Sequence, residues 1–448
     1  MSIFAKGKSV NLTDILANKT QRVARLHEVR QRFPDVTTIS ITLNIAGNIK
    51  NSRQIQVIFQ SGIQKLAKLF TPQWQVIHLD FQTGPEAIFV ADADANTCKK
   101  TAVAFETNFA LGRLFDVDIL VADGSHLSRT TLGLPHRTCY VCGDLAKVCA
   151  RSQKHPWIAI RKALDAIYLG YVRQDKEKWV SSAIRAMLYE VSVTPKPGLV
   201  DPSSQGSHQD MDAFLFMDSA LSLQAYFSDL YDISLSWPKS LPKLFQEIRE
   251  EGIKAETTML NTTQHVNTHK GAIFSLGILF SASVYQKQVA LKLPEIICQM
   301  LAGLTQRDFS DFTNKHPLTA GENQFLTYGI TGVRGEAEKG FPVVFDLALP
   351  YLKNRKGTMN DRLLDTLMLI ATSIKDTNLI KRAGGIHVLD NLQEQVTHFF
   401  DLGGAKTTAG KAYIHQLDQD FMRQNLSMGG AADLLILTIF LDLLTDTL

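Results

Sequence analysis

The spacing of apolar residues changes near residue 175, and this change constrains the fold of the chain more than any other feature of the sequence. Before it, apolar and polar residues alternate in short runs such as 39–45 and 115–121, the period of half-buried strands. After it the spacing is helical, as in 363–374. The sequence therefore predicts a multidomain chain, with an α+β domain at residues 1–175 and an all-α domain at 176–448.

Length and composition agree with a globular protein of more than one domain. A chain of 448 residues is too long for one ordinary domain. Hydrophobic residues make up 45% and charged residues 20%, which is typical of globular proteins. The formal net charge of +3 falls short of the basic excess that nucleic-acid binding needs, so nucleic acid is not an expected partner.

The sequence predicts neither export nor membrane insertion. The first twelve residues lack the apolar core of a signal peptide. The apolar stretches at 271–284 and 431–444 are shorter than the roughly 20 residues that cross a bilayer, so we expect buried helices there. Five cysteines, an odd number, argue against a disulfide framework. We therefore expect a cytoplasmic protein without a membrane partner.

Two aspartates, Asp116 and Asp118, are the main chemical signal in the first half of the chain. They alternate with apolar residues on an expected strand, so their side chains point to the same face. Mg²⁺ binds to a few carboxylates together with phosphate oxygens, and it assists phosphoryl and nucleotidyl transfer. The pair predicts a catalytic magnesium site, with Arg113 available to neutralise a phosphate. Two solvated aspartates on an exposed strand are the alternative.

Three cysteines and a histidine follow close together, at Cys139, Cys142, Cys149 and His155. Thiolates and an imidazole are ligands of structural zinc sites. The gaps between these residues are irregular for a common zinc module, and small cysteines are often buried without a metal. A structural Zn²⁺ site and a set of reduced structural cysteines both remain open.

Four segments of the first half, at 40–52, 83–86, 112–119 and 137–155, resemble the apo-citrate lyase phosphoribosyl-dephospho-CoA transferases. The resemblance implies a nucleotidyltransferase-like domain. It also implies transfer of phosphoribosyl-dephospho-CoA from a triphosphate precursor to a serine of the apo-citrate lyase acyl carrier protein, the gamma subunit, with release of pyrophosphate. The sequence departs from this family at Asn18-Lys19-Thr20, where an Arg-Glu or Arg-Asp pair is expected.

The second half contains polar or glycine-rich segments between its expected helices. They lie at 194–211, 267–271, 329–340, 375–385 and 427–433. In the first, two prolines around Lys196 fix an extended loop, and His208 and Asp210 are spaced to share a face. In the second, Lys270 follows His269 at the expected start of a helix, where free backbone N–H groups bind phosphate.

The other segments add charge of both signs. Arg334 and Glu336 lie among glycines that let a backbone approach a ligand closely. Asp433 precedes the most apolar helix, where an unpaired carboxylate is costly. Together the segments predict a site at helix ends that suits Mg²⁺ and a polyphosphate. The alternative is that these are ordinary turns and helix caps, and that His269 is a hydrogen-bonded structural residue.

The same segments, in the same order, resemble the triphosphoribosyl-dephospho-CoA synthases from about residue 180 to the end of the chain. The resemblance implies that ATP and 3′-dephospho-CoA are joined through the 2′-hydroxyl of dephospho-CoA, with release of adenine. On that basis we expect Glu336 to stabilise positive charge at C1′ or to act as the base. The expected Mg²⁺ ligands are Asp210, Asp376 and Asp433. The expected nucleotide and phosphate contacts are Lys196, His208, His269, Lys270, Arg334 and Asn378.

Two other functions remain open at this point. A Mg²⁺-dependent nucleotide N-glycosidase or ADP-ribosyl hydrolase, with a first domain that only docks the carrier protein, would use similar acidic helix ends. A synthase that serves malonate decarboxylase would make the same precursor, but the citrate-lyase-type motifs of the first half argue against it. The favoured interpretation is a bifunctional transferase.

Overall fold

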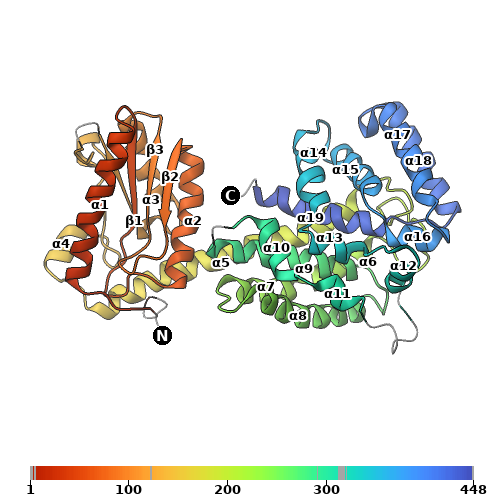
Figure 1. The fold of residues 1–448 in the computed structure, drawn as a ribbon, viewed down its shortest axis with the longest axis horizontal. Helices are drawn as coiled ribbons and strands as arrows, with labels where there is room; N and C mark the ends of the chain where they lie inside the picture. Colours follow the sequence, from red (N-terminus) through yellow and green to blue (C-terminus); the bar gives the residue numbers. More distant parts are fainter. Residues whose placement is uncertain are drawn as a thin grey trace. The chain divides into compact units, whose positions relative to one another are not determined.

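The computed structural model of the chain describes residues 4, 7–121, 124–289, 291–310, 318 and 320–445. Residues 1–3, 5 and 6 of the segment considered above for export lie outside this description. The chain divides into two compact units, Met1–Asp175 and Lys176–Leu448 (Figure 1). None of the described helices is both long and apolar enough to cross a membrane.

The first unit is built on a four-stranded antiparallel sheet with the strand order β2-β3-β1-β4. The strands are β1 (Thr37–Leu43), β2 (Trp74–His78), β3 (Glu86–Ala91) and β4 (Phe115–Leu120). Of these, β1 and β4 lie where the alternation at 39–45 and 115–121 predicts strands. Because β4 pairs only with β1, it forms one edge of the sheet.

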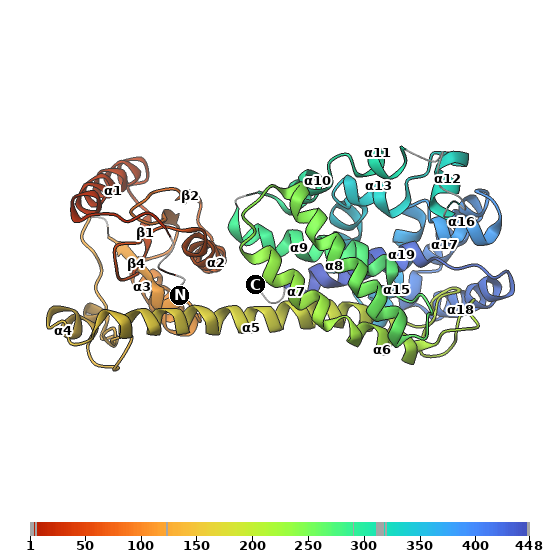
Figure 2. The same ribbon diagram turned by 90° about the horizontal axis from the view of Figure 1, so that it is seen from below.

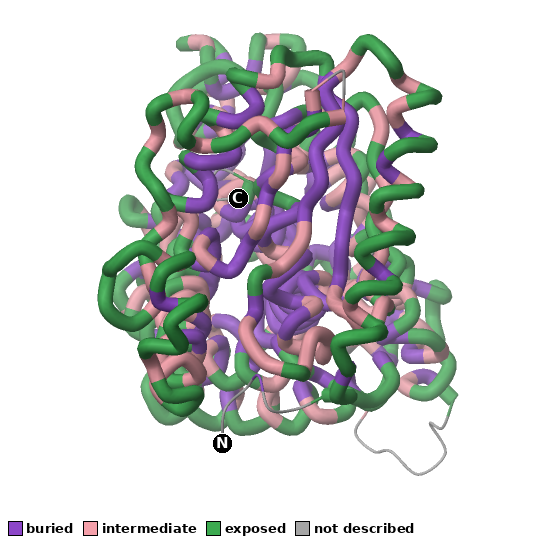
Figure 3. Tube along the Cα trace, turned by 90° about the vertical axis from the view of Figure 1, so that its left-hand side faces the viewer, coloured by how far each residue is buried: buried purple, intermediate pink, exposed green. Residues whose placement is uncertain are grey.

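Helices cover both faces of this sheet. The larger core packs one face against α2 (Arg53–Phe70), α3 (Ala95–Asn108) and the first part of α5 (Trp157–Ser192). A smaller cluster on the other face includes residues of α1 (Leu12–Arg32). Figure 3 shows the buried residues along extended strands and the exposed residues on the surrounding helices. The short helix α4 (Ala146–Arg151) follows β4 in the chain.

From residue 176 on, the described secondary structure elements are helices (Figure 2). After α5 they are α6 (Ala213–Ser222), α7 (Gln224–Leu235), α8 (Leu241–Thr262), α9 (Lys270–Tyr285), α10 (Leu293–Leu301), α11 (Leu304–Asp308), α12 (Ala320–Tyr328), α13 (Gly332–Glu338), α14 (Leu349–Asn354), α15 (Met359–Ser373), α16 (Thr377–Ala383), α17 (Val388–Asp401), α18 (Thr408–Arg423) and α19 (Gly429–Thr445). The structure thus combines many helices with one small antiparallel sheet.

Two helices, α9 and α19, lie at the centre of the second unit. Both are apolar nearly all round, and nearly every residue of α9 is buried. A helix of this kind needs neighbours on every side. Trp179 of α5 packs edge-on against Phe280 of α9 and Phe440 of α19, with ring centroids 5.9 and 6.1 Å apart. The N-terminal ends of these central helices carry residues of the second candidate site.

Two candidate active sites

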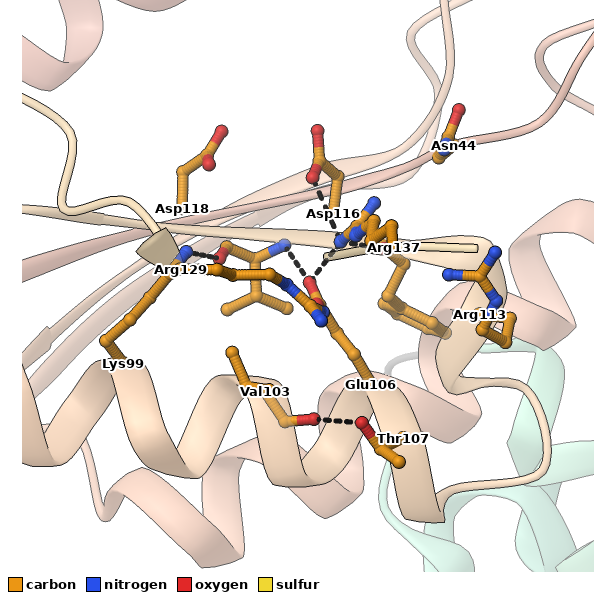
Figure 4. Close-up of polar contacts among 12 residues, drawn as sticks. Asn44, Lys99, Val103, Glu106, Thr107, Arg113, Asp116, Asp118, Arg129 and Arg137 are labelled. Carbon is orange, nitrogen blue, oxygen red and sulfur yellow. Dashed lines mark hydrogen bonds and ion pairs between the residues drawn. The ribbon is translucent and has the colours of Figure 1, made fainter. Parts of the chain in front are cut away.

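Asp116 and Asp118 project from the edge strand β4 on one face of the sheet (Figure 4). The register pairs Asp116 with Thr42 and Asp118 with Ser40 of β1, so all four side chains share a face. The two carboxylates remain accessible, with 46% and 41% of the side chains exposed. The predicted carboxylate pair is therefore open to a ligand.

A buried carboxylate, Glu106 of α3, supports the edge of β4 from the opposite side of the strand. Its Oε1 accepts a hydrogen bond of 3.0 Å from the backbone N–H of Val117. It also forms ion pairs with Arg129 and Arg137. Arg137 lies 3.1 Å from Oδ1 of Asp116, so one guanidinium joins the buried Glu106 to the exposed pair (Figure 4).

The surroundings of Asp118 raise its pKa. Burial is the main cause, and the neighbouring Asp116 adds to it, whereas His126, Lys99 and Arg137 oppose the rise. The Nδ1 atom of His126 lies 3.9 Å from Asp118. Paired carboxylates are a donor set that suits a divalent cation.

Arg113 bonds to the chain segment that follows β4. Its guanidinium donates to the carbonyl of Thr138 and lies 5.2 Å from the centre of the Tyr140 ring. Arg137 is the arginine in contact with Asp116. Sequence reasoning missed Arg137 as a site residue, although it opens the last of the four family-like segments. For Glu106 the sequence offers no local signal.

The atypical segment at Asn18 belongs to a second arginine–carboxylate cluster. Nδ2 of Asn18 donates to Glu86 over 3.2 Å, and Arg22 and Arg25 both form ion pairs with the same carboxylate. Glu86 faces Thr42 in the sheet register, and Thr42 in turn faces Asp116. The helix α1 therefore places arginine charge on the sheet face that carries the aspartate pair.

The four sulfur and imidazole residues of the first unit also come together. The ligand atoms of Cys139, Cys142, Cys149 and His155 all lie within 4.8 Å of one another. Sγ of Cys142 is 3.5 Å from Sγ of Cys149 and 3.2 Å from Nε2 of His155. The cysteines are free thiols.

The second candidate site is a cavity of about 230 Å³ in the helical unit. Four of the five polar segments contribute to its wall, together with the C-terminal part of α5. Its polar and charged lining residues are Glu190, Lys196, His208, Asn267, Thr268, His269, Lys270, Asn378, Arg382, Ser427 and Asp433. Segments separated by more than two hundred residues thus meet at the N-terminal ends of α9, α16 and α19.

The loop that follows α5 presents Lys196 to this cavity. Lys196 is fully buried and forms an ion pair with Glu190, whose backbone carbonyl also accepts a hydrogen bond of 2.8 Å from its Nζ. Asp201 fixes the loop by accepting from Thr194 and from the backbone N–H of Lys196, both over 3.0 Å. Sequence reasoning missed Glu190, which is hidden in an ordinary helical pattern.

His269 is buried at the cavity wall and keeps one ring nitrogen without a protein partner. Its Nδ1 lies 2.8 Å from Oγ of Ser219, and that oxygen accepts a hydrogen bond of 2.7 Å from Thr268. A hydrogen bond therefore joins Ser219 to Nδ1 of the ring, and it leaves Nε2 as the nitrogen that faces away from this serine. Burial, helped by the charge of Lys196, lowers the pKa of His269 to about 3. Nε2 is buried without a hydrogen-bond partner among the described residues.

Asp433 is the second carboxylate of the cavity. Burial raises its pKa well above the usual value, and Glu190 and Asp376 add to the rise. Among the described residues its carboxylate has no hydrogen-bond or ion-pair partner. The first turn of α9 approaches it closely, since a Cβ atom on Gly271 would lie 1.9 Å from Oδ2. Glycine is required there for this approach.

Arg382 and His208 close another part of the wall. Arg382 donates to the backbone carbonyl of Ser207 over 2.9 Å and to Oδ1 of Asn425 over 2.6 Å. Its second nitrogen lies 3.2 Å from Nδ1 of His208. Burial and the charge of Arg382 lower the pKa of His208, while Asp210 opposes this. Arg382 is a further cation that the sequence did not single out as a site residue.

Four residues proposed from the sequence are not among the described residues that line this cavity. Asp376 caps α16 and accepts N–H groups of Asn378, Leu379 and Ala431, and it is buried. Asp210 is exposed.

The other two belong to α13. Arg334 forms an ion pair with Asp308, with 2.7 Å between Nε and Oδ2. Glu336 accepts from the backbone N–H of Val343 over 2.8 Å, and burial raises its pKa. The predicted glycine-rich segment of α13 therefore forms its own contacts away from the cavity wall.

Comparison with known proteins assigns both units. Residues 176–448 match the family of ATP:dephospho-CoA triphosphoribosyl transferases, and residues 10–171 match the apo-citrate lyase phosphoribosyl-dephospho-CoA transferases. The chain is 41% identical to Protein CitXG of Leuconostoc mesenteroides, with both chains covered completely. It is 33% identical to Protein CitXG of Haemophilus influenzae, over 97% of this chain and 96% of the relative.

A shorter relative covers the second unit alone. A probable 2-(5′′-triphosphoribosyl)-3′-dephosphocoenzyme-A synthase of Lactiplantibacillus plantarum is 54% identical over 60% of this chain and 98% of its own length. These matches confirm the interpretation as a bifunctional transferase and do not favour the hydrolase alternative. The chain therefore belongs to the ATP:dephospho-CoA triphosphoribosyl transferase family through residues 176–448, matches the apo-citrate lyase phosphoribosyl-dephospho-CoA transferases through residues 10–171, and is a bifunctional transferase of citrate lyase prosthetic-group biosynthesis.

Proposed function

We propose that the two units catalyse consecutive reactions. Residues 176–448 join ATP to 3′-dephospho-CoA: the 2′-hydroxyl of dephospho-CoA attacks C1′ of the ATP ribose, the glycosidic bond breaks, and adenine leaves with a proton. Residues 1–175 then transfer the product. A serine of the apo-citrate lyase acyl carrier protein, the gamma subunit, attacks the α-phosphorus of the triphosphate, and pyrophosphate leaves. The first reaction supplies the substrate of the second.

The observation that carries the proposal for the second unit is the charge of its cavity. Lys196, Lys270 and Arg382 line it, and such cations bind a triphosphate. The backbone N–H groups at the start of α9 and α19 add partial positive charge. Nε2 of His269, which has no hydrogen-bond partner among the described residues, offers a further polar contact to the nucleotide.

Magnesium fits the same cavity because of Asp433. A carboxylate without a protein partner, close to a second carboxylate on Glu190, is a donor set that Mg²⁺ shares with phosphate oxygens. We propose Asp433 and Glu190 as its ligands in place of Asp376 and Asp210. When bound, the ion neutralises triphosphate charge. Lys196 forms an ion pair with Glu190, and the buried wall excludes water from the sugar carbon.

In the first unit we propose a nucleotidyltransferase-like site at the edge of β4. Asp116 and Asp118 are the proposed Mg²⁺ ligands, and when bound the ion supplies charge stabilisation for the transferring phosphoryl group. Arg137 and Arg113 lie on the same side of the unit as candidate phosphate contacts (Figure 4). The two exposed carboxylates leave room for a bulky donor and a protein acceptor.

A two-stage assay of the full-length chain tests this function. The chain is incubated with ATP, 3′-dephospho-CoA and Mg²⁺, and adenine is measured by chromatography. Apo-carrier protein is then added, and its mass is measured. We expect adenine release that depends on dephospho-CoA, followed by a carrier mass increase equal to phosphoribosyl-dephospho-CoA. Adenine release that needs no dephospho-CoA would instead favour a glycosidase.

A further inference from the structure

Residues 124–156 of the first unit are held together by little apolar packing. Cys149 is the one buried residue among these residues, all of which are described. Val141, Leu145 and Val148 are exposed by 40%, 48% and 55%. A segment of this length without an apolar core needs another source of stability, and in small protein modules that source is a disulfide or a metal ion.

The four donor groups described above occupy this segment and come from three parts of it. Cys139 and Cys142 lie on a hairpin in which Thr138 pairs with Leu145. Cys149 lies on α4, and His155 follows that helix. A tetrahedral zinc ion with sulfur ligands at about 2.3 Å separates its ligand atoms by roughly 3.8 Å. The observed ligand atoms, all within 4.8 Å of one another, have this compactness.

The backbone of the hairpin is also shaped like a metal-binding turn. The N–H of Val141 points at Sγ of Cys139 over 3.5 Å, a contact that stabilises a thiolate. Gly143 follows Cys142 with a φ of +76°, which lets the chain turn directly after the second sulfur. The 3.5 Å between the sulfurs of Cys142 and Cys149 is a contact of free thiols, far longer than the roughly 2.05 Å of a disulfide.

We propose that Cys139, Cys142, Cys149 and His155 bind a structural Zn²⁺ ion, and that this ion fixes the hairpin that presents Arg137 to Asp116. The base of the hairpin is held where Ala146 donates to the carbonyl of Arg137 over 2.9 Å. The tip, which carries Cys139 and Cys142, is held by the metal.

The positioning role connects the metal to the carboxylate pair. Arg137 lies two residues before Cys139 and bridges Glu106 and Asp116. Tyr140, one residue after Cys139, donates to the carbonyl of Asn44 over 2.8 Å. These side chains hold the hairpin to the sheet, and the metal would tie its tip to α4 and to the segment that follows α4. This part of the proposal rests on the proposed transfer reaction, whereas the metal site does not.

The first test measures the metal itself. The full-length chain is purified without chelators under reducing conditions, and its metal content is measured by elemental mass spectrometry. We expect about one zinc per chain, and in cobalt-grown protein the intense visible absorption of tetrahedral thiolate-bound Co²⁺. Cys142→Ser should lose both signals, whereas the matched control Cys298→Ser, in the other unit, should keep them. Metal at background level in the parent chain, or a Cys142–Cys149 disulfide in it, would overturn the site.

A second variant separates loss of metal from loss of folding. His155→Cys retains four ligands and should keep zinc, whereas His155→Ala should lose it or bind it at least tenfold more weakly. The His155→Ala chain should transfer the prosthetic group at least tenfold more slowly, while adenine release by the other unit stays at the parent rate. Zinc loss with unchanged transfer would overturn the positioning role and leave the metal site standing. If even the parent chain fails to modify the carrier, the metal content still decides the site.

Discussion

In the first unit the two carboxylates stand half-exposed on one strand, whereas in the second unit Glu190 and Asp433 face a cavity from helices far apart in the sequence. Water reaches the first pair and Arg137 contacts Asp116, so little further compensation is needed from the protein. The cavity has to offset its charges internally. Lys196 compensates Glu190, and Asp433 is left unpaired with a raised pKa.

This difference shows how exposure determines the way a site is built. A strand with period two brings two carboxylates together with no help from distant parts of the chain. A buried site instead needs charges of opposite sign from several segments, because an uncompensated charge in the interior is costly. The predictions below test whether the two sites are independent and whether burial is the feature that separates them.

The largest effect is expected for the double variant Asp116→Asn/Asp118→Asn. Removing both proposed metal ligands should reduce carrier modification by at least about 10⁴-fold, because the metal contributes several kcal/mol of transition-state stabilisation. Mass spectrometry of the carrier protein measures this. Adenine release should match the parent, which provides the control for folding. Carrier modification within tenfold of the parent would show that the pair is only a solvated strand face.

Asp433→Asn should impair the reaction of the second unit and leave that of the first unit unchanged. Adenine release should fall on the order of 10³-fold, since a proposed metal ligand is lost, while transfer of externally supplied precursor should be unchanged. The melting temperature should be equal to or higher than that of the parent, because a buried carboxylate without a partner is removed. A lower melting temperature would mean that Asp433 has a stabilising partner.

Arg137→Ala should weaken both stability and transfer in the first unit. Glu106 would keep Arg129 but lose a second charged partner, which should lower the free energy of unfolding by about 2 kcal/mol. Transfer should fall about 10²-fold because the arginine beside Asp116 is gone. Arg137→Lys should recover part of the transfer rate. Equal rates for Arg137→Ala and the parent would assign this contact to stability alone.

The smallest effect concerns the pH dependence of stability in the second unit. The pKa of His269 is about 3 in the folded chain. As the pH falls below about 6.5, the imidazole therefore takes up a proton in the unfolded state but stays neutral in the folded state. Stability is therefore lost on acidification. The variant His269→Asn keeps an acceptor for Ser219. Between pH 6.5 and 5.5 its free energy of unfolding should fall by about 1 kcal/mol less than that of the parent. Denaturant unfolding at the two pH values measures this, and identical losses would contradict the buried neutral imidazole.

Much of the fold could be predicted from local sequence patterns. The alternation around Ile39 and Ile41 predicted a half-buried strand, and β1 lies there, but its polar face is also buried at Thr38 and Ser40 because α1 covers that face. The apolar stretch at 431–444 predicted a buried helix, and α19 is buried nearly all round. The start of β2 at Trp74 was missed because Ile77 is apolar but exposed, so the apolar residues of this strand do not follow the alternation of its burial.

The candidate sites also differ in how much of them could be predicted from local sequence. Asp116 and Asp118 could be proposed as a pair because their geometry depends on one strand alone. Lys196, His208, His269, Lys270, Asn378 and Asp433 were proposed from polar segments, and the structure brings them to one cavity. Arg334 and Glu336 come from an equally polar segment, yet α13 directs them to Asp308 and Val343. Polarity at a helix end does not specify which way that end faces.

The sequence by itself determined the change from alternating to helical spacing of apolar residues, the carboxylate pair and the family-like segments. Each of these depends on residues close together along the backbone. Only the tertiary structure decided the partners: Arg137 beside Asp116, Glu190 beside Lys196, and Asp433 against the glycine of α9. Contacts of this kind join residues from separate elements, and their geometry depends on how whole helices and strands pack. Periodicity specifies which face of an element is buried, but packing chooses its neighbour.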